Sequence, residues 1–109
     1  MRVTTIGRVS GQERSVMLAY ITDGPNLHTM AMNGWDAPDP AWWLNLQAHP
    51  EAHIQLIDGP LDVVARAAEG EERSRLWQAW EEIDDDLAAF ASLRPTETAV
   101  VVFEPVHAD

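Results

Sequence analysis

Apolar residues along this chain recur mainly in short runs with strand-like alternation, which indicates a sheet rather than a helical bundle. Strand-like segments occupy residues 2–6, 15–21, 27–32, 52–57, 61–68 and 98–103. Turn-forming residues separate several of them: Gly7-Arg8-Val9-Ser10-Gly11, Asp23-Gly24-Pro25-Asn26 and Asp58-Gly59-Pro60. Strands joined by tight turns are antiparallel. The pattern therefore predicts six mainly antiparallel strands.

Two segments have helical spacing instead. The first covers residues 40–48 and must end before Pro50, and in it Trp42 and Asn45 share a face that can line a cavity. The second covers residues 71–92, where acidic residues crowd the first turn and apolar residues recur at helical intervals through Phe90. Together these elements predict an α+β fold: a small, mainly antiparallel β-barrel with a short and a longer accessory helix.

Length and composition place all of this in one domain, residues 1–109. A hydrophobic content of 46% with five tryptophans is enough for one core. No segment approaches the ~20 apolar residues of a membrane span, and no signal-peptide pattern opens the chain, so we expect a cytoplasmic protein. The chain has no cysteine, and its four histidines lack ligand spacing, so we expect no metal site.

The net charge of −11 argues against nucleic acid or an anionic membrane as a partner. Its distribution is uneven, because residues 1–20 hold Arg2, Arg8 and Arg14 against the single acid Glu13. This locally basic segment contains the Gly-Arg-Val-Ser-Gly turn, whose amides, hydroxyl and guanidinium suit a phosphate group. A turn of this kind can also simply close a hairpin, and the residues of the turn alone leave both interpretations open.

Two motifs together carry a family resemblance. The first is Thr4-Thr5-Ile6-Gly7-Arg8-Val9-Ser10-Gly11 followed by Arg14, and the second is Pro40-Ala41-Trp42-Trp43-Leu44-Asn45-Leu46-Gln47-Ala48-His49-Pro50. At this spacing the chain resembles the deazaflavin (coenzyme F-420)-dependent nitroreductase and quinone reductase family over nearly its whole length. The resemblance implies a six-stranded split β-barrel, as in flavin-binding pyridoxamine-phosphate-oxidase-like proteins. It also implies an enzyme that passes a hydride from reduced F-420 to a quinone, a nitro compound or another small electrophile.

The same resemblance implies roles for individual residues. Phosphate and tail contacts are expected from Arg8, Ser10, Gly11 and Arg14, and contacts with the deazaflavin ring from Met17, Leu18, Trp42 and Asn45. Asn33 is a further cofactor-binding candidate, while Trp35 and Phe90 are candidates on the substrate side. No catalytic residue is predicted, because the chemistry belongs to the cofactor.

Departures from the family pattern keep alternatives open. Val9 stands where many relatives have Lys, and Phe90 where several have Tyr, so a non-catalytic F-420 carrier is a rival to the reductase. FMN is an alternative cofactor on the same barrel. The sequence also leaves open whether the protein is a homodimer, and it does not identify the small-molecule electron acceptor.

Overall fold

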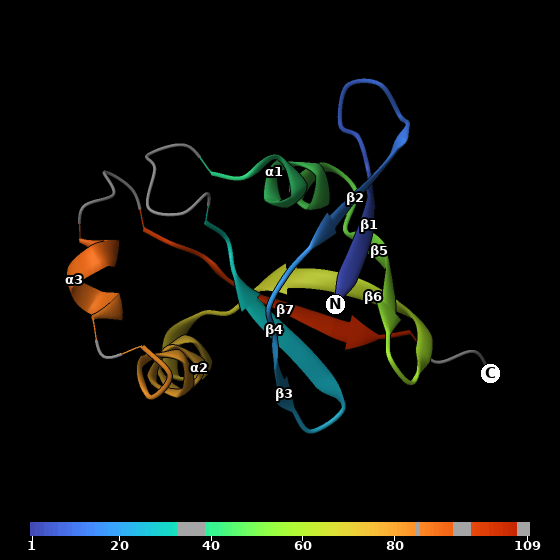
Figure 1. Ribbon diagram of the computed structural model, residues 1–109. Helices are drawn as coiled ribbons and strands as arrows, with labels where there is room; N and C mark the ends of the chain where they lie inside the picture. Colours follow the sequence, from blue (N-terminus) through green and yellow to red (C-terminus); the bar gives the residue numbers. More distant parts are fainter. Residues whose placement is uncertain (33–38, 85, 93–96, 107–109) are drawn as a thin grey trace.

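The computed structural model describes residues 1–32, 39–84, 86–92 and 97–106, with the side chains of residues 88 and 90 excepted (Figure 1). Its strands are β1 (Arg2–Ile6), β2 (Glu13–Met17), β3 (Ile21–Asp23), β4 (Asn26–Met30), β5 (Glu51–Leu56), β6 (Gly59–Ala67) and β7 (Val100–Pro105). Its helices are α1 (Ala41–Ala48), α2 (Gly70–Glu81) and α3 (Leu87–Ala91). No helix in the described part of the chain is long and apolar enough to cross a membrane.

All seven strands belong to one antiparallel sheet with the order β2-β1-β5-β6-β7-β4-β3. The mainly antiparallel class is confirmed, but the predicted count of six strands is wrong, because the sheet has seven, and this sheet does not close into a barrel. The segment predicted as one strand, residues 15–21, contributes to two. β2 pairs with β1 at one edge of the sheet, whereas β3 pairs with β4 at the other. The chain therefore bends at residues 18–20 to pass between the two edges.

The helix predicted over residues 71–92 is also divided. α2 ends at Glu81, and α3 begins at Leu87. The Asp84 carboxylate accepts a hydrogen bond of 3.1 Å from the Asp86 amide, a local bond that competes with continued helix. As a result Ile83, expected on the apolar face, is 68% exposed, while Leu87 is buried. α1 begins at Ala41, immediately after Pro40, close to the prediction.

The core has two parts, which lie on the two faces of β7. Val101 and Phe103 face the larger cluster, which includes Trp42, Trp43 and Leu46 of α1. Val100 and Val102 face the smaller cluster, which includes Leu76 of α2. Because successive strand residues point to opposite faces, this central strand is buried on both sides. Figure 1 shows α1 beside β1 and the β1–β2 turn, away from α2.

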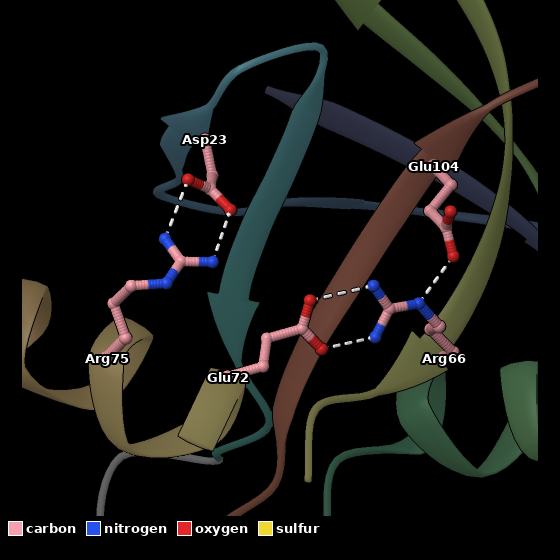
Figure 2. A network of polar contacts seen from close by, with 5 residues as sticks. All are labelled: Asp23, Arg66, Glu72, Arg75 and Glu104. Atoms are coloured by element: carbon pink, nitrogen blue, oxygen red, sulfur yellow. Dashed lines mark hydrogen bonds and ion pairs between the residues drawn. The ribbon is translucent and has the colours of Figure 1, made fainter. Parts of the chain in front are cut away.

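Ion pairs and one buried hydrogen bond fix α2 against the sheet. Arg66 of β6 lies between Glu72 of α2 and Glu104 of β7, and Arg75 of α2 binds both oxygens of Asp23 at 2.9 and 3.0 Å (Figure 2). The hydrogen bonds from the two guanidinium groups lower the pKa of Glu72 and of Asp23 below their ordinary values.

His28 of β4 provides the buried bond. Its Nδ1 accepts a 3.0 Å hydrogen bond from the Trp80 indole N–H of α2, and its side chain is fully buried. Burial lowers the pKa of His28, which favours the neutral imidazole that can accept this bond. Helix α2 is therefore a firmly attached structural element, separate from the region where polar groups converge on a cavity.

Candidate functional site

The turn between β1 and β2 has a defined internal structure. The Gly7 amide donates to the Gln12 carbonyl at 2.8 Å, and the Gly11 amide donates to the Gly7 carbonyl at 2.9 Å. The Gln12 amide donates to Ser10 Oγ at 3.2 Å. Gly11 has a φ of +71°, and a Cβ at Gly7 would lie 2.9 Å from Ser10 Oγ. The backbone conformation therefore favours glycine at position 11, and a side chain at position 7 would require Ser10 to shift.

Fewer turn amides are available to a ligand than the sequence suggested. The Arg8 amide donates to Asn45 Oδ1 at 3.1 Å, so it too is occupied. Within the described chain, the amides of Val9 and Ser10 have no hydrogen-bond partner. Two successive free amides at a turn form a small concavity with partial positive charge, which is suited to an anionic oxygen.

The Arg8 guanidinium is held by the same asparagine. Its Nη1 donates to Asn45 Oδ1 at 2.9 Å, and Asn45 Nδ2 donates to Thr5 Oγ1 at 3.4 Å. Asn45 and Thr5 are both buried, whereas Arg8 is exposed. These contacts join α1 to β1 and to the turn that directly follows β1, across about 40 residues of the chain.

A cavity of about 580 Å³ opens beside these groups. The turn, β2 and α1 provide most of its walls, and its lining residues are Thr5, Gly7, Arg8, Val9, Ser10, Arg14, Ser15, Val16, Pro40, Ala41, Trp42 and Asn45. Its size is within the range of small-molecule sites. Polar groups of the turn and apolar side chains such as Val16 and Trp42 line the same cavity, which suits a ligand with a charged end and a flat apolar part.

No described carboxylate pairs with the two arginines at this cavity. Of the arginines that the structure describes, Arg66, Arg73 and Arg75 form ion pairs with carboxylates. Arg8 and Arg14 form none with any acidic residue that the structure describes. Their positive charge is available to an anionic ligand, and it is placed where the two free turn amides also lie.

The structure brings together five of the predicted cofactor-binding residues. The lining of the cavity includes Arg8, Ser10, Arg14, Trp42 and Asn45. The prediction that Trp42 and Asn45 share a face of the helix is confirmed, because both line this cavity from α1.

The other predicted residues have different positions. Gly11 shapes the turn but does not line the cavity, and neither do Met17, which is 72% exposed, and Leu18, which packs against the larger core cluster. Asn33 and Trp35 lie outside the described residues. The backbone of Phe90 lies in α3, but its side chain is not described.

Sequence reasoning missed Thr5, Ser15 and Val16 as lining residues. Thr5 could have been found, since the two-residue period of a strand places it on the same face as Val3, directly before the turn. The part of the chain that the structure describes has no group of three His, Cys, Asp or Glu residues able to hold a metal ion.

An antiparallel sheet, an arginine-bearing hairpin turn and a helix thus surround one cavity. The chain belongs to the F420H(2)-dependent quinone reductase family, whose sequence model matches residues 1–105. A Mycobacterium tuberculosis protein assigned as a quinone reductase of this kind is 39% identical over 70 residues, which are 64% of this chain. The match covers 59% of that relative, so this chain corresponds to only part of its length.

Solved structures agree with this assignment. A protein described as an F420-H2 dependent reductase superposes with a TM-score of 0.82 at 31% identity, covering 94% of this chain and 91% of its own. A Listeria innocua protein assigned as a pyridoxamine 5'-phosphate oxidase superposes at 0.63 and 16% identity, covering 97% of this chain and 82% of its own. The second match concerns the fold alone. It supports the expected similarity in fold to pyridoxamine-phosphate-oxidase-like proteins and nothing further.

Proposed function

We propose that this protein binds coenzyme F-420 in the cavity between the β1–β2 turn and α1, and uses its reduced form to reduce a quinone. The observation that carries the proposal is the placement of Arg8 and Arg14 beside the cavity, without a carboxylate partner among the described residues, in a chain of this family. An anionic cofactor with a flat ring fits both the charge and the wall formed by Trp42. FMN shares those properties, so it is the alternative cofactor to be tested.

Each part of the cavity has a distinct role in this proposal. Arg8 and the amides of Val9 and Ser10 bind the phosphate, Arg14 of β2 meets the anionic tail, and Trp42 packs against the ring. When bound, reduced F-420 supplies a hydride, and a quinone becomes a quinol by accepting that hydride and one proton. The described cavity lining has no His, Cys, Asp or Glu side chain, so the proton is expected to come from solvent. The protein's contribution is to hold the ring and leave one face of it accessible.

The first experiment is a spectroscopic titration with F-420 and, separately, with FMN. The proposal predicts saturable binding of F-420 that is tighter than binding of FMN, because the glutamate tail adds anionic groups opposite Arg14. Tighter binding of FMN would transfer the proposal to a flavin. Binding of neither cofactor would refute it.

The second experiment separates a reductase from a carrier. A reductase oxidises reduced F-420 in the presence of a quinone only when protein is added, and NADPH does not replace the cofactor. Trp42→Ala is expected to slow this oxidation because it removes the wall that positions the ring. Phe90→Tyr, which restores the phenol found in several relatives, is expected to retain the activity. F-420 binding without oxidation across a panel of quinones and nitroaromatics would leave the carrier as the function. Homodimerisation and a cytoplasmic location stay predictions.

A further inference from the structure

Asn45 is the buried polar residue that connects α1 to the β1–β2 turn. Its side-chain oxygen accepts two hydrogen bonds from Arg8, one from the amide at 3.1 Å and one from Nη1 at 2.9 Å. Its side-chain nitrogen donates to Thr5 Oγ1 at 3.4 Å. The side chain of Asn45 is only 4% exposed; its bond to Thr5 is buried, and its two bonds to Arg8 are partly buried.

The orientation of the Asn45 amide follows from these partners. The Arg8 amide and guanidinium can only donate, so both require the carbonyl oxygen of Asn45. The Thr5 hydroxyl can accept, so it suits the nitrogen. A flipped amide would direct N–H groups at the N–H groups of Arg8, which is unfavourable in a buried site. Thr5 therefore fixes Asn45, and Asn45 fixes Arg8.

We propose that Asn45 is a positioning residue for cofactor binding, which acts by holding the Arg8 guanidinium ready for the anion; this inference rests on the proposed function. A free arginine side chain on an exposed turn loses rotamer entropy when it binds a phosphate. Arg8 has already lost part of that freedom, because Asn45 holds Nη1 and the backbone next to it. A ligand consequently meets a guanidinium that is ordered before binding.

The chemical nature of asparagine is central to this role. A carboxylate would hold the guanidinium at least as firmly, but it would also neutralise its charge. The neutral amide accepts the same bonds and leaves the positive charge available. Only one of the five N–H donors of Arg8 is used by Asn45, so the others can bind oxygens of a ligand.

The test is a double-mutant cycle with Asn45→Ala and Arg8→Ala, in which affinity is measured for F-420 and for its deazaflavin chromophore lacking phosphate and tail. Asn45→Ala is expected to weaken F-420 binding about tenfold, just below the range for a direct hydrogen bond to a charged group, because Asn45 acts on the anion only through Arg8. In the Arg8→Ala background the same change is expected to cost less than about threefold, because the guanidinium it would position is absent. Binding of the truncated chromophore is expected to stay nearly unchanged.

Asn45→Asp isolates the effect of charge. It keeps an acceptor for Arg8 but cancels the positive charge, so it too is expected to weaken F-420 binding, although the turn keeps its place. The matched control is Gln47→Ala, which removes an exposed amide of the same helix outside the cavity and is expected to leave affinity unchanged. If Asn45→Ala unfolds the protein, Thr5→Val replaces it as a milder variant, because it removes only the acceptor for Asn45. Thr5→Val is expected to weaken F-420 binding less in the Arg8→Ala background than in the unaltered protein.

Two results would overturn the inference while the proposed function stands. Independent effects of Asn45→Ala and Arg8→Ala would mean that Asn45 does not act through Arg8. An equal loss of affinity for F-420 and for the truncated chromophore would mean that Asn45 contacts the ring itself. Failure of the unaltered protein to bind F-420 would overturn the proposed function, and this inference with it.

Discussion

Replacing Arg8 by Ala tests the chemical basis of the site most directly. The guanidinium lies beside the cavity, has no carboxylate partner in the described structure, and is exposed, so its removal leaves no buried acid unpaired. A hydrogen bond to a charged group contributes about 1.5–3 kcal/mol, which corresponds to a loss of affinity of about 13- to 160-fold. Because the site is open to water, we expect a loss in the lower half of this range.

Arg2→Ala is the matched control for this measurement. Arg2 is exposed at the far end of β1, is absent from the cavity lining, and forms no ion pair within the described residues. Its removal changes the net charge by the same amount. Salt screens a charge at the end of β1 far from the turn, because the Debye length is about 8–10 Å at moderate ionic strength. We therefore expect Arg2→Ala to change the affinity for F-420 less than twofold.

Calorimetric or fluorescence titration with F-420 at two salt concentrations measures both effects. Thermal unfolding followed by circular dichroism should show nearly unchanged stability for both variants, since both side chains are exposed. The Arg8→Ala loss is expected to shrink as salt rises, and to be larger for F-420 than for analogues stripped of glutamates. Equal losses for Arg8→Ala and Arg2→Ala would show that only overall charge matters and would refute the placement of the phosphate at the turn.

Four further variants test the attachment of α2 to the sheet and the charge of the turn. Trp80→Phe leaves the buried His28 without its donor, so urea unfolding should show a loss of about 1–3 kcal/mol. Burial lowers the pKa of His28, so its contribution to stability is complete above its ordinary pKa of 6.5 and declines as pH falls from there toward the folded-state value. His28→Phe should therefore reduce the decline in melting temperature between pH 7.5 and 5.5. Arg66→Met breaks the pairs with Glu72 and Glu104, but these groups are partly exposed, so we expect a loss of only about 1 kcal/mol in urea unfolding. Val9→Lys adds a cation at the 92% exposed tip of the turn, so F-420 should bind a few-fold more tightly at low salt, and the gain should vanish at high salt.

The fold was predictable where local signals and global packing agree. Turn residues such as glycine, aspartate and asparagine indicated the hairpins, and the apolar run of residues 98–103 indicated the last strand, which the structure has at Val100–Pro105. The bend at residues 18–20 was not predictable, because the apolar pattern continues through it. Which strand each half pairs with is decided by the sheet as a whole. Likewise, periodicity does not reveal that the long helical pattern is divided between Glu81 and Leu87, where the Asp84 side chain binds the Asp86 amide.

The candidate site was predictable in its residue types and less so in their roles. The Gly-Arg-Val-Ser-Gly turn and the helix face of Trp42 and Asn45 do line one cavity. The sequence could not indicate that most of the turn amides are occupied internally, or that Asn45 binds Arg8. The Arg8–Asn45 contact joins residues 37 positions apart, and it depends on how α1 packs against the β1–β2 turn.

Strand β2, which carries Arg14, is an edge strand that pairs only with β1 in the sheet. Local opening should therefore expose the amides of β2 and of the turn to solvent often. The amides of the central strand β7 should be exposed only when the whole domain opens. A ligand that bridges Arg8, Arg14 and α1 would close this hairpin against the helix. Amide hydrogen exchange across residues 7–17 would then slow on binding while exchange in β7 stays constant. The hairpin thus acts as an internal reporter of occupancy, readable by mass spectrometry for any candidate ligand, coloured or not.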